Sequence, residues 1–480
     1  MKLSELIESI ETIKIKGSLD IEIENVKTDS NSVSNGSLFI CISGQGYDGH
    51  SFIKQAENYG AVAIVCERET ETSLPQIIVK NSRKAMSIIA SKFYGDVAKN
   101  MKIIGVIGTN GKTTTSHLIY NVLKKTGKKC GLIGTLGVYF NDKFIEPTLT
   151  TPDPLELHKI LSKMKSDGVD IVIMEVSAHA LYFDKVEGIQ FEVGIFTNFT
   201  RDHLDFFKDM ESYKKAKLSF FKNNKVRFIV TNSDDSVGRE ILNFNDKAIS
   251  YGIENPSDVF AIDIKEKSNG LSFVLNLFDI VYKVNLRLIG KFNVYNALAA
   301  GTACALLGVN SEEVVFGLQT VAGVSGRLEN VHSDKFDVFV DYAHTPDGLI
   351  KSINALRPVC KGKLICVFGC GGNRDVGKRA EMGRISGNLA DFTVITSDNP
   401  RYEEPMEIIF EIEKGILEKS KRYVIIQDRV QAIKYALEIA CLGDVILIAG
   451  KGCEKYQEIL GIKHLYNDKD TVNEIMRRKK

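Results

Sequence analysis

The stretch that decides the fold of this chain is Ile103-Ile-Gly-Val-Ile-Gly-Thr-Asn-Gly-Lys-Thr-Thr-Thr115. An apolar, β-branched run leads into Gly108-Thr-Asn-Gly111, and Lys112-Thr113 then open a segment with the apolar spacing of a helix. Glycines let backbone N–H groups approach a phosphate, the helix N-terminus adds positive potential, and Lys112 supplies a full charge. A hydroxyl at Thr113 can bind Mg²⁺. The pattern predicts a nucleotide phosphate loop, although six residues, not the usual five, separate Gly105 from Lys112.

The composition indicates a soluble protein with several hydrophobic cores. At about 150 residues per domain, 480 residues correspond to roughly three domains, and a hydrophobic content of 44% excludes a disordered chain. Lys and Arg number 62 against 61 Asp and Glu, so the charge gives no reason to expect nucleic acid or a membrane as partner. The nine cysteines show no zinc spacing, and acidic residues follow Met1 too soon for a signal peptide. We therefore expect a cytoplasmic protein. We also expect a monomer, although nothing in the composition decides the oligomeric state.

Apolar runs alternate with amphipathic segments through most of the chain. The candidate strands are Ser37–Ile42, Ala61–Cys66, Gln76–Val79, Ile103–Ile107, Asp170–Glu175, Val193–Thr197, Arg227–Thr231, Phe336–Val340, Leu364–Phe368, Phe392–Thr396, Tyr423–Ile426 and Val445–Ile448. Such runs, separated by helices, are typical of parallel sheets covered on both faces. Residues 258–290 instead alternate as hairpin strands do, and Ala297–Val309 is predicted to be a buried helix, too short to span a membrane.

These patterns predict an α/β fold class with three domains. The N-terminal domain (residues 1–100) is mixed α/β, and the central domain (101–328) is a P-loop-type parallel-sheet ATPase domain. The C-terminal domain (329–480) is a Rossmann-like α/β domain.

Three side chains near the ends of predicted elements are candidates for chemistry. Glu175 ends an apolar strand, where a Mg²⁺ ligand is expected in a P-loop sheet. His203 follows the next strand, but taken alone it is more typical of a hydrogen-bonded structural histidine. Lys217, taken alone, is typical of a solvated helix lysine. The residues by themselves leave these alternatives open.

The order of several motifs resembles that of the Mur ligases, which are ATP-dependent amide-bond-forming ligases of peptidoglycan precursor synthesis. The motifs are Gly108–Thr114, Glu175-Val-Ser177, Asn198–Asp205, Ala216-Lys217, Gly290–Asn296, Gly326-Arg327 and Asp341–His344. The pattern is most similar to the branch that extends UDP-N-acetylmuramoyl-L-alanyl-D-glutamate. The resemblance implies that the three domains bind the UDP-sugar, ATP and an amino acid, respectively.

The resemblance also assigns roles to individual residues. The implied catalytic residues are Lys112, Glu175, His203 and Lys217, with Lys217 modified to a carbamate. The implied ligands of Mg²⁺ are Thr113, Glu175, His203 and the carbamate of Lys217. The implied ATP contacts are Gly108, Thr109, Asn110, Gly111, Lys112, Thr113, Thr114, Asn296, Arg327 and Asp341. The implied contacts to the UDP-sugar-peptide are Ser30, in the segment Thr28-Asp-Ser30, with Thr150, Thr151, Ser177 and Lys185.

The motif Asp398-Asn-Pro-Arg401 indicates the amino acid that is added. In the family this motif goes with meso-2,6-diaminopimelate, which is lysine bearing a second carboxylate. A guanidinium pairs with a carboxylate through two parallel hydrogen bonds, whereas lysine would leave Arg401 without a partner. The implied diaminopimelate contacts are Arg374, Asp398, Asn399, Pro400, Arg401, Gly450 and Glu454.

Several residues depart from the family pattern. Ala178 replaces a serine, Phe183 a polar residue, Lys185 an arginine, Ser325 a proline and Cys453 a histidine. Lysine keeps the charge of arginine but loses its planar fork, so anion binding at Lys185 is expected to be weaker. None of these changes removes an implied metal ligand, Lys112 or Arg401.

The expected reaction converts the D-glutamyl γ-carboxylate to an acyl phosphate with ATP, after which the diaminopimelate amine displaces phosphate. The sequence does not identify a base for that amine. One alternative is a related ligase, either a lysine-adding member of the same branch or an enzyme like folylpolyglutamate synthase. Another is a catalytically silent P-loop protein that only binds nucleotide.

Overall fold

The computed structural model describes residues 1–44, 46–146, 148–222, 225–267, 270–419 and 422–478. Its strands form three larger sheets and one two-stranded hairpin. The chain divides into two compact units. The first holds Met1–Gly105, Lys129–Glu192 and Ser219–Arg227, and the second holds Val106–Lys128, Val193–Leu218 and Phe228–Lys480. Strands of the second sheet belong in part to each unit, so each unit is described by itself.

The N-terminal sheet has the order β1-β5-β4-β3-β2, and only β1 runs antiparallel to its neighbour. Its core lies on both faces because alternate residues of each strand point to opposite sides. Leu38 and Ile40 pack toward α1 and α3, whereas Phe39 packs toward α2. The elements are α1 (Leu3–Ile7), β1 (Thr12–Lys16), β2 (Asn25–Lys27), β3 (Ser37–Ile40), α2 (Ile53–Asn58), β4 (Ala61–Cys66), β5 (Gln76–Val79) and α3 (Ser82–Phe93).

In the first unit, part of the second sheet has the order β6-β10-β7-β8-β9. β10 and β7 are parallel, whereas β8 and β9 extend the sheet as antiparallel strands. The elements are β6 (Lys102–Ile107), β7 (Cys130–Gly134), β8 (Gly137–Phe140), β9 (Lys143–Ile145), α5 (Pro154–Ser166), β10 (Ile171–Glu175) and α6 (Ala178–Tyr182). The sequence predicted β6 and β10 but missed β7, β8 and β9.

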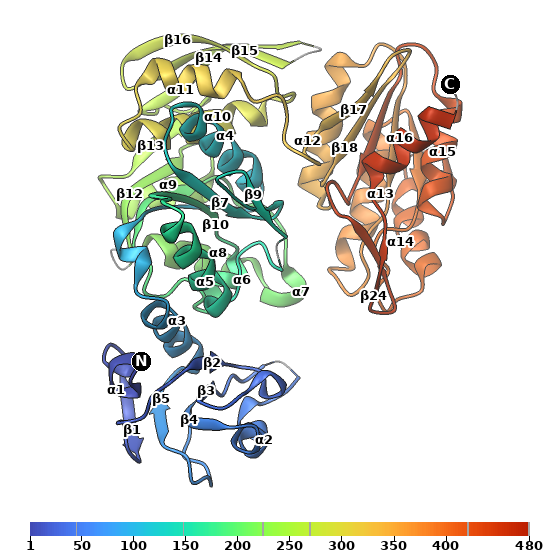
Figure 1. The fold of residues 1–480 in the computed structure, drawn as a ribbon. Helices are drawn as coiled ribbons and strands as arrows, with labels where there is room; N and C mark the ends of the chain where they lie inside the picture. The colour runs from blue at the N-terminus through green and yellow to red at the C-terminus, as the bar shows by residue number, and fades with distance from the viewer. Residues whose placement is uncertain (45, 147, 223–224, 268–269, 420–421, 479–480) are drawn as a thin grey trace. The chain divides into compact units, whose positions relative to one another are not determined.

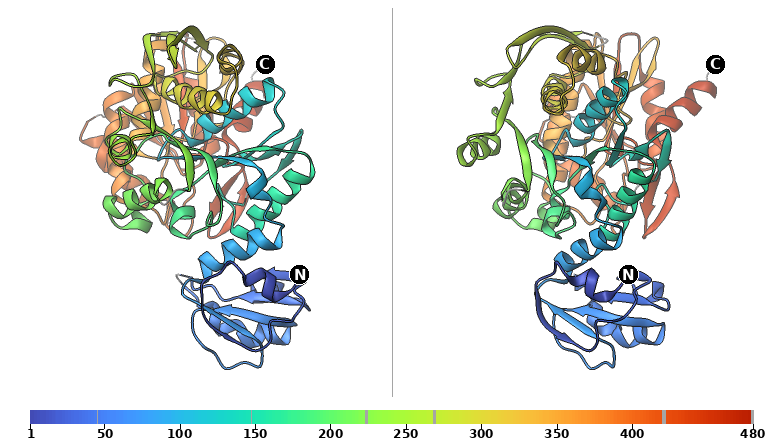
Figure 2. Two further views of the ribbon diagram at one scale, coloured as in Figure 1. Left: turned by 90° about the vertical axis from the view of Figure 1, so that its left-hand side faces the viewer. Right: turned by 60° about the vertical axis from the view of Figure 1, so that its left-hand side comes forward.

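In the second unit, the same sheet has the order β16-β15-β14-β13-β12-β11. The predicted hairpins of residues 258–290 are confirmed as the antiparallel pairs β14–β15 and β15–β16. The predicted buried helix is confirmed as α10, which with α11 packs against α4 (Figure 2). The elements are α4 (Lys112–Lys125), β11 (Phe191–Phe196), α7 (Leu204–Phe207), α8 (Met210–Leu218), β12 (Val226–Asn232), α9 (Ser236–Phe244), β13 (Ile249–Gly252), β14 (Val259–Lys267), β15 (Gly270–Leu277), β16 (Ile280–Leu286), α10 (Phe292–Leu306) and α11 (Ser311–Gln319).

The C-terminal sheet has the order β17-β18-β22-β19-β20-β21, and only the edge strand β17 is antiparallel to its neighbour. Helices α12, α13 and α14 cover one face and α15 and α16 the other (Figure 1). A separate hairpin, β23–β24, follows β22. The elements are β17 (Glu329–Ser333), β18 (Asp337–Asp341), α12 (Pro346–Leu356), β19 (Leu364–Phe368), α13 (Gly377–Leu389), β20 (Phe392–Ile395), α14 (Pro405–Leu417), β21 (Tyr423–Ile425), α15 (Arg429–Ile439), β22 (Val445–Ala449), β23 (Tyr456–Ile459), β24 (Ile462–Leu465) and α16 (Asp468–Arg478).

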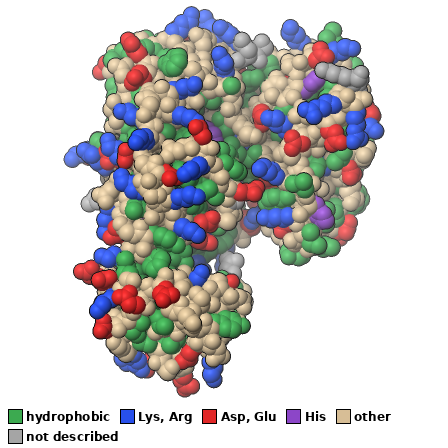
Figure 3. Space-filling view, viewed as in Figure 1, with side chains coloured by type: hydrophobic (Ala, Val, Ile, Leu, Met, Phe, Trp, Pro, Cys, Tyr) green, Lys and Arg blue, Asp and Glu red, His purple; other side chains and the backbone are tan. Residues whose placement is uncertain are grey.

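Charged side chains of both signs are interspersed over the surface visible in Figure 3, as the balanced composition leads one to expect. Across the described residues, no helix combines the length and the apolar character needed to cross a membrane.

His158 is a buried histidine that is expected to make the stability of the fold depend on pH. It lies on α5, is 0% exposed, and neither ring nitrogen has a hydrogen-bond partner among the described residues. Burial lowers the pKa of His158 from 6.5 to about 4. The unfolded chain therefore takes up a proton near pH 6.5 that the folded chain resists, so stability should fall as the pH drops from about 6.5 to 4. At about 1.4 kcal/mol per pKa unit, the loss amounts to at most about 3.5 kcal/mol.

Thermal unfolding across this pH range measures the effect. The decrease in melting temperature on acidification should be smaller in His158→Leu than in the wild type. In His464→Leu, a substitution at an exposed position of β24, the decrease should be the same as in the wild type. Identical pH profiles for the wild type and His158→Leu would contradict the assignment.

Candidate functional site

The phosphate loop is held in shape by the segment that follows β11. Gly108 and Gly111 have φ angles of +152° and +88°, and Gly111 caps the N-terminus of α4. The backbone N–H of Thr109 donates to the carbonyl of Asn198 (2.8 Å), and that of Asn110 donates to its side-chain oxygen (2.9 Å). The predicted helix start at Lys112 is confirmed. The loop thus has a fixed backbone that leads directly into the N-terminus of α4, the kind of helix end that favours anions.

Two lysines lie close together at this loop. The Nζ of Lys112 donates to the carbonyl oxygens of Gly108 (3.0 Å) and Thr109 (2.9 Å). Lys217, on α8, is 1% exposed, and its Nζ lies 4.6 Å from the centre of the Tyr213 ring. Burial, followed by the charge of Lys112, lowers the pKa of Lys217 well below its usual value, although Asp202 and Asp235 oppose the shift. The alternative that Lys217 is a solvated helix lysine is therefore wrong.

Asp202 is a site residue that the sequence reasoning did not single out. Its Oδ2 lies 3.4 Å from Nε2 of His203 and 3.9 Å from Nε2 of His344. Burial opposes ionisation, but the two histidines and Lys378 lower the pKa of Asp202 to about 2. The carboxylate is therefore ionised, and it faces His203, a predicted metal ligand. The only signal in the sequence was its place next to His203.

The predicted nucleotide contacts in the second unit lie around the start of α4. Arg327 donates from Nη2 to Oγ1 of Thr113 (3.1 Å), and Thr115 donates from Oγ1 to Oδ1 of Asn296 (3.3 Å). Asp341 accepts hydrogen bonds from two backbone N–H groups and from a serine hydroxyl, and burial raises its pKa. Asn296 and Arg327 are thus brought to the start of α4. The carboxylate of Asp341 instead accepts its hydrogen bonds from groups of the protein.

In the first unit, the predicted sugar-peptide residues gather at the carboxyl end of β10. Glu175 is buried and accepts from the backbone N–H (3.0 Å) and the hydroxyl (3.0 Å) of Thr135. Thr135 and Thr150 share a hydroxyl contact of 3.1 Å. Thr151 donates to the carbonyl of Glu175 (2.8 Å) and accepts from the N–H of Ser177 (3.0 Å). The structure therefore brings Thr150, Thr151, Glu175 and Ser177 together.

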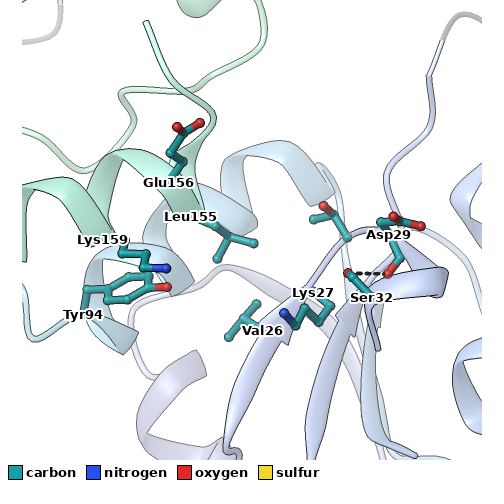
Figure 4. Close-up of a pocket in the computed structure, with 9 residues that line it drawn as sticks. Val26, Lys27, Asp29, Ser32, Tyr94, Leu155, Glu156 and Lys159 are labelled. Atoms are coloured by element: carbon teal, nitrogen blue, oxygen red, sulfur yellow. Dashed lines mark hydrogen bonds between the residues drawn. The ribbon is translucent and has the colours of Figure 1, made fainter. Parts of the chain in front are cut away.

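No hydrogen bond between described residues joins Lys185 or Ser30 to this group. Lys185 pairs with Asp153 at 2.8 Å, and Ser30 donates to Gln55 (3.1 Å). Beside Ser30 the first unit has a pocket of about 280 Å³. Lys159 and Tyr94 lie on one side of it and Asp29 and Ser32 on the other (Figure 4). Val26, Lys27, Thr28, Leu155 and Glu156 complete the lining.

The segment Asp398–Arg401 follows β20 and is held in place by hydrogen bonds with buried polar groups. Lys451, which is fully buried, donates to Oδ1 of Asn399 (2.9 Å) and to Oε2 of Glu454 (2.8 Å). Asn399 donates in turn to the same Glu454 oxygen (2.9 Å). Gly450 has a φ of +112°, and a Cβ there would lie 2.6 Å from Oδ2 of Asp398. These contacts bring four predicted diaminopimelate residues together.

Both arginines of the predicted amino-acid site contact carboxylates of the protein. Arg374 lies 3.4 Å from Asp205. Arg401 donates from Nη1 to the carbonyl of Gly372 (2.7 Å) and from Nε to Oε2 of Glu458 (3.2 Å). Glu458 was not predicted from the sequence, because only the pairing of β23 with Arg401 brings it there.

The predicted metal ligands include only two of the residue types that most often bind metals, His, Cys, Asp and Glu. No group of three or more such residues that could hold a metal occurs within the part of the chain that the structure describes. The predicted ligands contain just two residues of that kind, Glu175 and His203. The remaining donors would be the hydroxyl of Thr113 and a modified Lys217, and Mg²⁺ prefers oxygen ligands of these kinds.

A glycine-rich loop between a strand and a helix of a largely parallel sheet, with further α/β sheets before and after it in the chain, is typical of nucleotide-binding proteins. Three protein-family descriptions match consecutive parts of the chain. They are "Mur ligase family, catalytic domain" over residues 22–94, "Mur ligase middle domain" over 106–304 and "Mur ligase, glutamate ligase domain" over 326–452.

Comparison with individual proteins supports the same family. The UDP-N-acetylmuramoyl-L-alanyl-D-glutamate–2,6-diaminopimelate ligase 1 of Clostridium acetobutylicum is 46% identical over 99% of both chains. A solved UDP-N-acetylmuramoyl-L-alanyl-D-glutamate–2,6-diaminopimelate ligase has a TM-score of 0.71 at 30% identity, covering 100% of this chain and 99% of its own. Folylpolyglutamate synthase of Mycobacterium tuberculosis shares the fold at a TM-score of 0.64 and 17% identity, covering 76% of this chain and 92% of its own.

The chain belongs to the Mur ligase family, whose members are ATP-dependent ligases that form amide bonds. The predicted family, enzyme class and three-domain α/β architecture are confirmed.

Gly111 provides a direct test of the phosphate loop. A Cβ at this position would lie 2.5 Å from Oδ1 of Asn296 and would force an alanine to a φ of +88°. Gly127→Ala is a matched control, because Gly127 also has a positive φ (+71°) but open space around it. Each variant should lose about 1 kcal/mol of stability from backbone strain. Only Gly111→Ala should weaken the binding of a non-hydrolysable ATP analogue, by about tenfold or more, in calorimetric titration. Equal nucleotide affinities in the two variants would contradict the assignment.

Proposed function

We propose that this enzyme joins meso-2,6-diaminopimelate to the D-glutamyl γ-carboxylate of UDP-N-acetylmuramoyl-L-alanyl-D-glutamate, with conversion of ATP to ADP and phosphate, in peptidoglycan precursor synthesis. The observation that carries the choice of amino acid is Arg401. Its guanidinium stands next to the network of Lys451, Asn399 and Glu454, in a chain 46% identical to a ligase named for diaminopimelate.

The chemistry requires activation of a carboxylate. An oxygen of the γ-carboxylate attacks the γ-phosphorus of ATP, and ADP leaves. The nitrogen of the diaminopimelate amine then bonds to the carbonyl carbon of the acyl phosphate, and the tetrahedral intermediate expels phosphate as its C–O bond breaks. Lys112 neutralises the charge that develops on the transferred phosphoryl group. Holding both reactants in place supplies much of the rate.

We assign ATP to the phosphate loop, Gly108–Thr114, with Asn296, Arg327 and Asp341 as further contacts. The contacts between Arg327 and Thr113 and between Thr115 and Asn296 support this assignment. The UDP-sugar-peptide is assigned to Ser30, Thr150, Thr151, Ser177 and Lys185. The pocket beside Thr28 and Asp29 and the grouping of Thr150, Thr151 and Ser177 near Glu175 support it.

We further propose that Lys217 is carbamylated. Burial and the charge of Lys112 lower the pKa of Lys217 and so favour its neutral amine. That amine can attack CO₂, forming an N–C bond and releasing a proton, so that an oxygen ligand replaces the amine. Thr113, Glu175, His203 and this carbamate would hold Mg²⁺, which supplies charge neutralisation at the phosphates. The burial of Lys217 beside Lys112 supports the modification.

The domain roles follow from these assignments. Residues 1–100 bind the UDP-sugar, 101–328 bind ATP and 329–480 bind the amino acid, which we assign to Arg374, Asp398, Asn399, Pro400, Arg401, Gly450 and Glu454. Because ATP and nucleotide-linked sugars are cytoplasmic metabolites, we place the reaction in the cytoplasm. A lysine-adding enzyme is disfavoured because lysine has no second carboxylate to accept a hydrogen bond from Arg401. An enzyme like folylpolyglutamate synthase is disfavoured because such a protein matches only 76% of the chain.

Phosphate release from ATP tests the function. Release should require the UDP-sugar-dipeptide together with meso-diaminopimelate, and should be much weaker with L-lysine. Arg401→Ala should lower kcat/KM for diaminopimelate by about a hundredfold, the value of a buried charge-assisted contact. Arg384→Ala, which removes an exposed arginine of α13, should leave it unchanged. A wild-type preference for lysine would overturn the assignment of Asp398–Arg401, and no turnover with either amino acid would favour a silent binding protein.

Substitution of Lys217 tests the carbamate. Lys217→Ala should lose nearly all ligase activity, because the oxygen ligand is gone, and should regain part of it with added formate or acetate. Lys215→Ala, an exposed position on the same helix, is the control and should stay active. Full activity of Lys217→Ala without any added carboxylate would remove Lys217 from the metal site.

A further inference from the structure

Arg83 is a partly exposed residue in the first turn of α3, and two contacts within the first unit fix its guanidinium. The Cζ of Arg83 lies 4.5 Å from the centre of the Phe183 ring. Its Nη2 donates to the carbonyl oxygen of Ser43 (2.8 Å). Ser43 belongs to the N-terminal sheet region and Phe183 follows α6, so the guanidinium joins two parts of the unit that are far apart in the sequence.

The contact with Ser43 places Arg83 at the edge of the N-terminal sheet where ligands are expected. β2 and β3 are neighbouring parallel strands, with Lys27 opposite Phe39. The chain therefore leaves both strands at the same edge, with Ser30 shortly after β2 and Ser43 shortly after β3. In open α/β sheets, ligands bind at the carboxyl ends of the strands. Arg83 thus contacts the edge that also carries Ser30, a residue assigned to the UDP-sugar.

The contact with Phe183 places the same guanidinium beside the segment that carries the sugar-peptide residues. Phe183 follows the last turn of α6, and Ser177 caps the N-terminus of this short helix. Ser177 belongs to the group of residues at the carboxyl end of β10. The segment after α6 is also joined to α3 directly, because Asn81 donates from Nδ2 to Oδ2 of Asp184 (2.9 Å). Arg83 therefore lies between the residues assigned to the two ends of the nucleotide-linked substrate.

The charge of Arg83 is not neutralised as that of its neighbours is. Lys185 is only 11% exposed and pairs with Asp153 at 2.8 Å, and Lys84 pairs with Glu187 at 3.4 Å. No carboxylate of the described residues pairs with Arg83, and its Nε and Nη1 donate to none of those residues. A guanidinium stacked on a ring keeps its in-plane donors free, and their planar fork matches the oxygens of a phosphate.

We propose that Arg83 binds the diphosphate of the nucleotide-linked substrate and so selects the UDP-linked sugar-peptide. The proposal rests on the proposed function. In UDP-N-acetylmuramoyl-L-alanyl-D-glutamate the diphosphate joins the uridine to the sugar and its peptide, as Arg83 joins the two groups of residues assigned to them. The proposal also accounts for two departures from the family pattern. The ring of Phe183 supports the guanidinium, and Arg83 supplies the planar fork that Lys185 lacks.

The test uses Arg83→Met, which removes the charge but can still pack on the Phe183 ring. The KM for UDP-N-acetylmuramoyl-L-alanyl-D-glutamate and the inhibition constant of UDP should both rise by about ten- to a hundredfold, because charged hydrogen bonds are lost. The KM values for ATP and diaminopimelate should stay unchanged. The KM for the UDP-linked substrate should also rise less steeply with salt than in the wild type. Lys92→Met, in the last turn of α3, makes the same charge change and should alter none of these values.

Several results would overturn the proposal. An unchanged KM for the UDP-linked substrate would mean that Arg83 does not contact it. A raised KM with unchanged inhibition by UDP, or a wild type that UDP does not inhibit, would exclude the diphosphate as the group bound. An unchanged dependence on salt would mean that Arg83 only positions α3 against α6. If Arg83→Met does not fold, Arg83→Lys decides the matter, because loss of the planar fork should still raise KM. Failure of the proposed function would differ, because the wild type would then turn over neither amino acid.

Discussion

The burial of Lys217 beside Lys112 is the constraint on which the site depends. Two like charges in a region of low dielectric repel strongly, and burial alone disfavours a charged amine. The Nζ of Lys112 donates to the carbonyl oxygens of Gly108 and Thr109. Lys217 lies over the ring of Tyr213, and burial together with the charge of Lys112 lowers its pKa well below the usual value. The same geometry therefore favours the neutral amine of Lys217, the form that carbamylation would convert into an oxygen ligand.

The C-terminal domain contains charge pairs that differ in how deeply they are buried. Arg429 and Asp468 are almost fully buried and pair at 2.8 Å, and Arg379 is paired with Glu403 and Glu411. Such buried pairs hold elements in register, and removing one partner would leave a costly unpaired charge. Arg401 and Glu458 pair at 3.2 Å with about a fifth of each side chain exposed.

Local patterns predicted the fold well where the chain follows one periodicity. The apolar runs at β4, β5 and β19 match their predicted bounds, and α4 begins at the predicted Lys112. β7 was missed because two of its five residues are glycines, which weaken a strand pattern, although its burial in a parallel sheet sustains it. Judged from its local sequence, Lys217 was typical of a solvated helix lysine. Its burial could not be predicted, because it depends on tertiary contacts that no local pattern contains. Glu458 could not be found because its partner lies 57 positions earlier, across a bridge between separate segments.

A competition experiment tests the proposed reaction most directly. The enzyme is incubated with ATP, UDP-N-acetylmuramoyl-L-alanyl-D-glutamate and equal amounts of meso-diaminopimelate and L-lysine, and the nucleotide products are identified by mass spectrometry. We predict a single amide product that contains diaminopimelate, formed in the same amount as the phosphate released. A lysine-containing product, or release of phosphate without any amide product, would contradict the account.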